Sequence, residues 1–169
     1  MNYAAQLLQE HSRANTDKIA KAIGDKPLEF RKIIKIIYNE KPPLPQRAAW
    51  LLVAVNNKYP ELLKEYIPKF ISDINSFNLD ALKRNMSRVI ASHKIPKKLQ
   101  GKLVTICFDL ILSNEETVAV KVNAMQCIAN IAKEHPELIN ELKAAIEDQL
   151  PKTTAAFHAR ARMVLKALK

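Results

Sequence analysis

Five basic side chains are the residues in this sequence best suited to binding a charged partner, because Lys and Arg donate charge-assisted hydrogen bonds to carboxylates and phosphates. They are Arg47, Arg84, Arg88, Lys121 and Arg160. Arg84 and Arg88 are four positions apart, so on a helix they share one face, where like charges repel unless an anion or an acid relieves them. We predict that these five residues contact a partner, with Arg84 and Arg88 preferred. Alternatively, this pair is solvated or bound to Asp80 or Glu116.

The sequence contains no pattern typical of catalysis or metal binding. None of the histidines has a second His, Cys or carboxylate at HxxxH or HExxH spacing. The histidines are His11, His93, His135 and His158. No GxSxG motif is present, and the isolated Gly24 and Gly101 cannot form a phosphate-binding loop. We therefore expect no catalytic residue, no metal site, no cofactor and no enzymatic activity.

A repeat of four segments positions the basic residues. Each segment opens with a proline, which suits the first turn of a helix because its missing N–H would have no partner there. The prolines are Pro27, Pro60, Pro96 and Pro136. Apolar residues at helical spacing follow each of them. The repeat predicts four helical hairpins, preceded by an N-terminal helix pair.

An acid lies 12 or 13 residues after each proline, and a base lies early in the second helix of each hairpin. The acids are Glu40, Asp73, Asp109 and Asp148, and the bases are Arg47, Arg84, Lys121 and Arg160. One interpretation is a ladder, in which each acid pairs with the base of its own or the next repeat. The other is that the bases line a binding surface.

The periodicity and the turn residues predict where the helices lie. We expect helices at about 3–11, 15–24, 27–39, 45–58, 60–75, 79–93, 97–112, 117–134, 137–149 and 153–168. Pro68 should kink the helix begun at Pro60, because it removes one hydrogen bond and crowds the carbonyl four residues back. We expect one all-α domain over 1–169, with N-terminal cap helices in 1–26 and repeats at 27–59, 60–95, 96–135 and 136–169.

The segment from Pro60 to His93 resembles a HEAT repeat, with a proline inside its first helix, an acid near the end of that helix and a base in the second helix. The other hairpins lack the internal proline and are HEAT-like. The chain also resembles a bacterial family of small HEAT-like proteins, in segments such as QRAAW and VKVNAMQCIANIAKEHPEL. This resemblance implies an α-α superhelix of the HEAT/armadillo type.

The composition limits where and how the chain works. No run of about 20 apolar residues is present, so we expect no membrane span. Cys107 and Cys127 lie in apolar helical runs and form no CxxC pair, which indicates buried thiols in a reducing compartment. We expect a cytoplasmic protein that is a monomer by default. Its net charge of +10, from 27 basic and 17 acidic residues, favours acidic partners.

Three functions compete on these observations, and the weakest of them is an enzyme of unrecognised type, for which the sequence offers no acid, base or nucleophile in suitable company. The first is a non-catalytic scaffold whose groove binds a protein or peptide. The second is a nucleic-acid-binding protein with a basic groove. A remote form of the second is suggested by HEAT-like DNA glycosylases, which share the architecture but hold DNA with groove aromatics and a carboxylate. Trp50 lies in the apolar run AAWLLVAV, and we predict that it belongs to the core. A continuous positive track through the five bases would favour nucleic acid, and neutralisation by the repeat acids would favour a protein.

Overall fold

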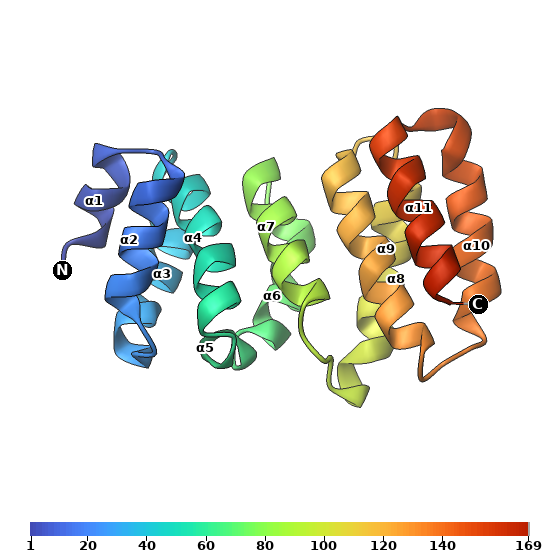
Figure 1. Ribbon diagram of the computed structural model, residues 1–169, viewed down its shortest axis with the longest axis horizontal. Coiled ribbons are helices and arrows are strands. Elements are labelled where there is room, and N and C mark those ends of the chain that lie inside the picture. The colour runs from blue at the N-terminus through green and yellow to red at the C-terminus, as the bar shows by residue number, and fades with distance from the viewer. Residues whose placement is uncertain (169) are drawn as a thin grey trace. The chain divides into compact units, whose positions relative to one another are not determined.

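The computed structural model describes residues 1–168, and these residues form α-helices and short 3-10 helices without a β-strand (Figure 1). Ala, Lys, Leu and Ile are the most frequent residues of the sequence, and most of them favour the helix. The predicted all-α class is confirmed. The helices follow one another as an N-terminal pair and four hairpins.

The first half of the chain begins with four helices. They are α1 (Tyr3–Gln9), α2 (Arg13–Ile23), α3 (Pro27–Asn39) and α4 (Leu44–Lys58). Ser12 caps α2, because its side chain accepts a hydrogen bond from the backbone N–H of Asn15 at 3.0 Å. The Asn15 side chain in turn donates to the carbonyl oxygens of Gln6 at 2.9 Å and Glu10 at 2.8 Å. The start of α2 therefore holds the end of α1.

The second hairpin contains the predicted break at Pro68. Its first arm consists of α5 (Glu61–Lys64), α6 (Ile67–Asp73) and the 3-10 helix η1 (Ile74–Ser76), and its second arm is α7 (Asp80–Ala91). Helix α5 ends at Lys64, four residues before Pro68, where the proline ring crowds the backbone carbonyl. The predicted kink is thus a complete break between two short helices.

The last two hairpins have long, nearly unbroken arms. They are α8 (Lys97–Leu112) with α9 (Val118–Ala132), and α10 (Leu138–Gln149) with the 3-10 helix η2 (Leu150–Lys152) and α11 (Ala155–Ala167). The predicted ranges 27–39 and 97–112 agree with α3 and α8 at both ends. Both helices begin next to a marker proline, which defines their first residue closely.

The chain divides into two compact units, Met1–Val89 and Ile90–Lys169. In the first unit, the largest fully buried side chains include Phe30, Leu52 and Phe70. In the second unit, Phe157 is fully buried and Met125 is equally inaccessible. Each unit therefore has an apolar core of its own.

The two cysteines are free and buried, as the sequence predicts. Both lie in the second unit, Cys107 on α8 and Cys127 on α9. The hydrogen bond with Cys127 raises the pKa of the Cys107 thiol, and burial raises it further. The Cys107 thiol is therefore protonated and poorly reactive in the folded protein.

Candidate partner-binding depression

A depression of about 270 Å³ lies in the first unit, where three helices each contribute one stripe of side chains. Its lining consists of Arg13, Thr16 and Asp17 of α2, Trp50, Val53, Ala54 and Asn57 of α4, and Asn85 and Arg88 of α7. Helices α4 and α7 are the second arms of their hairpins, and α2 is the second helix of the N-terminal pair. We call this feature the Trp50 depression. The spacings of three and four residues within each stripe are those of one helix face.

Trp50 is the aromatic side chain of this depression, and the prediction that it belongs to the core is wrong. It is 38% exposed. Helix α4 buries a different face, made by Ala48, Ala49, Leu51, Leu52 and Val55. Trp50 lies between two buried residues in the sequence but on a different face of the helix, which it shares with Val53, Ala54 and Asn57. The polar Asn57, seven residues after Trp50 on the same face, is the one sequence feature that could have revealed this orientation.

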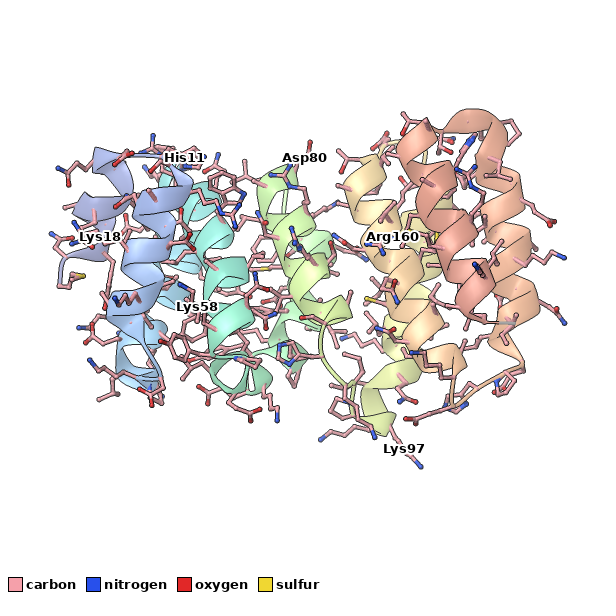
Figure 2. All side chains as sticks on the ribbon, viewed as in Figure 1. His11, Lys18, Lys58, Asp80, Lys97 and Arg160 are labelled. Atoms are coloured by element: carbon pink, nitrogen blue, oxygen red, sulfur yellow. The ribbon has the colours of Figure 1, made fainter. Side chains whose placement is uncertain are left out.

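His11 covers part of the Trp50 ring. The two ring centroids are 4.8 Å apart and the planes are inclined by 21°, so the rings are stacked. His11 lies beside the N-terminal end of α2 (Figure 2). The indole therefore has a fixed orientation in the depression while more than a third of it stays accessible.

Charged and amide groups surround the indole. The Arg13 Nε lies 3.8 Å from Asp17 Oδ2, and the Arg13 side chain is 94% exposed. Arg88 is exposed on α7. Asn85, one turn earlier, is buried and donates a 2.7 Å hydrogen bond to the carbonyl oxygen of Ala81. The depression thus combines an aromatic surface, two arginines and one carboxylate.

Arg47 does not line the depression, although the sequence singled it out. Its Nη1 donates hydrogen bonds to the carbonyl oxygens of Leu7 at 2.6 Å and Leu8 at 3.0 Å. Both carbonyls belong to the last turn of α1, where backbone acceptors have no partner within the helix. Arg47 therefore holds the end of α1, and the ladder interpretation is wrong for this residue. The partners lie about 40 positions earlier and have no sequence signal.

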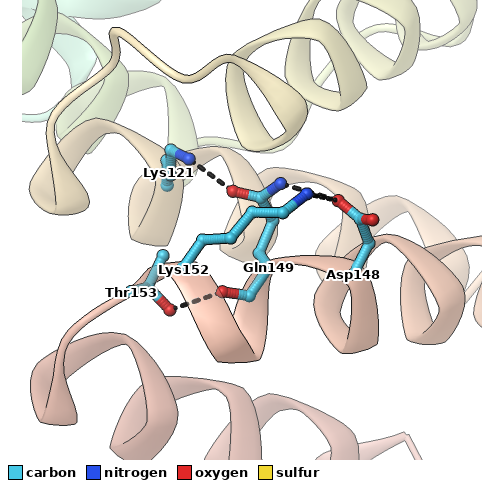
Figure 3. A network of polar contacts seen from close by, with 5 residues as sticks. All are labelled: Lys121, Asp148, Gln149, Lys152 and Thr153. Atoms are coloured by element: carbon cyan, nitrogen blue, oxygen red, sulfur yellow. Dashed lines mark hydrogen bonds and ion pairs between the residues drawn. The ribbon is translucent and has the colours of Figure 1, made fainter.

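Lys121 is buried within the second unit, with 5% of its surface exposed, so it cannot serve as a surface contact. Its Nζ donates a 2.5 Å hydrogen bond to Oε1 of Gln149 (Figure 3). Gln149 Nε2 donates to Asp148 Oδ2 at 2.9 Å, and Lys152 Nζ donates to the same oxygen at 3.0 Å. The network links Lys121 to the acid of the following repeat, a pairing that the ladder interpretation did not include, and the link is indirect because the neutral amide of Gln149 lies between base and acid.

Burial lowers the pKa of Lys121, because the charged ammonium loses solvation, and repulsion from Lys152 lowers it further. The charges of Glu116 and Asp148 act in the opposite direction. At Asp148, the hydrogen bonds from Lys152 and Gln149 lower the pKa of the carboxyl group. The network therefore keeps Asp148 ionised at neutral pH.

A second repeat acid, Asp73, has its partner within its own helix. Asp73 Oδ2 lies 2.9 Å from Lys69 Nζ, four residues earlier. The same ammonium lies 4.4 Å from the centre of the Tyr38 ring, where a cation is attracted by the aromatic face. The ladder interpretation assigned Asp73 to Arg84 or Lys121, the bases of its own and the next repeat, and did not include Lys69.

The two remaining predicted contacts lie in different units. Arg84 is exposed on α7, one turn before Arg88. Arg160 is half-buried on α11 and lines a smaller depression of about 170 Å³, together with Gln126, Lys133 and Met163. Of the five predicted residues, Arg88 alone lines the Trp50 depression.

The described residues contain no group of three or more His, Cys, Asp or Glu side chains arranged to hold a metal ion. Among them, no helix has both the length and the apolar character needed to cross a bilayer.

Consecutive helical hairpins that bury one face and present a stripe of polar and aromatic side chains on another define a helical-repeat protein. A family model described as the HEAT repeat domain matches residues 3–168. The chain therefore belongs to the HEAT-repeat family, as its resemblance implied. Comparison with curated proteins gave no match, and comparison with solved structures gave none. HEAT repeats are helical scaffolds that commonly mediate protein interactions and are typically non-catalytic.

Proposed function

We propose that this protein is a non-catalytic scaffold that binds a protein or peptide through the Trp50 depression. The observation that carries the proposal is the exposure of Trp50 on a helix whose leucines are all buried. Trp and Arg are among the residue types enriched at the energetic centre of protein interfaces. In this proposal the repeats at 27–59, 60–95, 96–135 and 136–169 form one binding module with the N-terminal pair.

The positions and contacts of the five predicted basic residues favour a protein partner over nucleic acid. Arg47 donates its hydrogen bonds to backbone carbonyls, and Lys121 is buried and donates to the side-chain amide of Gln149. A continuous track through all five bases is therefore not available to a phosphate backbone, which needs several exposed cations for affinity. Buried thiols accord with a cytoplasmic location, and we propose a monomer.

A comparative pull-down from native lysate tests this function. Immobilised wild-type protein is compared with Trp50→Ala and with Leu112→Ala, which removes an exposed leucine of α8 in the other unit. We expect the wild type and Leu112→Ala to retain the same protein, and Trp50→Ala to lose it. Retention of the same proteins by all three would contradict the proposal, as would retention of nucleic acid alone.

A further inference from the structure

The Trp50 depression has the chemistry to select its partner, and this inference rests on the proposed function. We propose that it binds a segment of another protein in which an aspartate or glutamate stands next to an apolar side chain. The apolar side chain covers the exposed part of Trp50, and the carboxylate pairs with Arg88 and Arg13.

The apolar half of this recognition follows from α4. Trp50, Val53 and Ala54 form a continuous stripe along one side of the helix, and they line the depression together. His11 stacks on the indole and fixes its orientation, so little ordering of the ring is needed when a ligand binds. The depression of about 270 Å³ has room for one large side chain. Covering the indole removes apolar surface from water, which favours binding.

The charged half follows from the arginines of the two neighbouring helices. Arg88 is exposed on α7, and a guanidinium can donate two parallel hydrogen bonds to one carboxylate. On α2, Arg13 is paired with Asp17 at 3.8 Å, which is long for a charge-assisted hydrogen bond, and its side chain is 94% exposed. An exposed pair of this kind contributes little, so Arg13 is free to turn to a ligand carboxylate.

Asp17 determines which anions the depression accepts. Its carboxylate lines the depression, and its side chain is 48% exposed. A like charge opposes any incoming anion, and a phosphodiester chain places a charge at every nucleotide along its length. A peptide can instead present a single carboxylate to the arginines and an apolar or neutral group toward Asp17. The presence of Asp17 therefore favours an acidic peptide over an oligonucleotide.

Selection from a random library tests the inference without assuming a sequence. A phage library of random 12-residue peptides is selected on the full-length protein, and peptides that also bind Trp50→Ala are removed. We expect the remaining peptides to be enriched in Asp or Glu beside an aromatic or aliphatic residue. Peptides without that enrichment would overturn this inference and leave the proposed function intact. A failure to obtain any Trp50-dependent peptide, with a labelled (dT)20 bound instead, would overturn both.

Fluorescence anisotropy then assigns the charged contacts, using a selected peptide and a copy with its acids changed to amides. We expect Arg88→Gln to weaken binding of the acidic peptide by about 10- to 100-fold. This range corresponds to the free energy of one hydrogen bond to a charged group. The amide peptide should bind Arg88→Gln and wild type alike. Asp17→Asn should bind the acidic peptide more tightly than wild type. Lys35→Gln, which removes a charge from the exposed face of α3, is the matched control and should change nothing. Equal weakening by Arg88→Gln and Lys35→Gln, or no effect of Asp17→Asn, would contradict the arrangement.

Discussion

The Nζ atom of Lys121 lies 2.5 Å from the Oε1 atom of Gln149, and both side chains are buried. A buried cation is usually balanced by a carboxylate, and here the immediate partner is a neutral amide. The carboxylate of Asp148 lies one hydrogen bond further away, where it is exposed and also binds Lys152. This arrangement joins α9 to the end of α10 without burying an ion pair.

Removing either member of this pair should destabilise the protein by different amounts. We expect Lys121→Met to cost about 1–3 kcal/mol, because the Gln149 oxygen loses its donor. Gln149→Leu should cost more, because a buried ammonium is left without a partner. The double variant should regain part of the loss. Chemical denaturation measures the free energy of unfolding, with Lys166→Met, an exposed lysine of α11, as the control. An unchanged midpoint for Lys121→Met would contradict the role of this contact.

Arg47 should stabilise α1 in particular. In Arg47→Met, the carbonyl oxygens of Leu7 and Leu8 lose a charged donor, and we expect a loss of about 1–3 kcal/mol. Relative to wild type, the substitution should accelerate amide exchange in α1 more than in α3. Hydrogen exchange measured by NMR will show this difference. Lys58→Met removes an exposed cation from the same helix and is the control. Uniform acceleration across the first unit would argue against a local effect.

The low pKa of Asp148 predicts a pH-dependent contribution to stability. Its hydrogen bonds with Lys152 and Gln149 favour the ionised form in the folded state. A carboxyl group whose pKa is lowered by folding stabilises the protein above its unfolded value of about 3.9, and the contribution is lost as the pH falls through the folded pKa. Asp148→Asn should therefore be less stable than wild type at pH 7, and the difference should shrink below about pH 4. A constant difference between pH 7 and pH 3, measured by urea denaturation, would show that the charge of Asp148 contributes nothing.

The stacking of His11 on Trp50 should be visible in fluorescence, because the sequence contains one tryptophan. Removing the imidazole in His11→Ala uncovers one face of the indole, so acrylamide should quench its emission more strongly. The free energy of unfolding should fall by at most about 1 kcal/mol, the scale of an aromatic pair near the surface. His158→Ala, a change in the other unit, should leave the quenching as in wild type. Identical quenching in His11→Ala and wild type would mean that the rings do not stack in solution.

The sequence was sufficient to predict the helices because their limits have local causes. Pro27 and Pro96 mark the starts of α3 and α8, and the break before Pro68 follows from the geometry of the proline ring. Repetition of these markers also revealed the hairpins. Features that depend on a few neighbouring residues were therefore predictable.

The candidate site was only partly predictable, because orientation depends on distant contacts. Helix α4 is apolar around much of its circumference, so its composition does not say which face is buried and the prediction placed Trp50 in the core. Arg88, which lines the depression, was singled out in the sequence from its spacing to Arg84. Arg47 and Lys121 were predicted to lie on the surface, but Arg47 binds a backbone carbonyl and Lys121 binds a glutamine. Neither partner is charged, so the charge pattern of the sequence gives no sign of these contacts.

The way α1 is held has a consequence for synthesis on the ribosome. This seven-residue helix is too short to persist alone, and residues from three later helices secure it. Asn15 and Arg47 bind its last carbonyls, and the Glu29 carboxylate accepts a 2.6 Å hydrogen bond from the Tyr3 hydroxyl. Helix α1 must therefore remain unfolded during synthesis until α4 has emerged. During that interval α1 is accessible to any chaperone or processing enzyme that acts during translation.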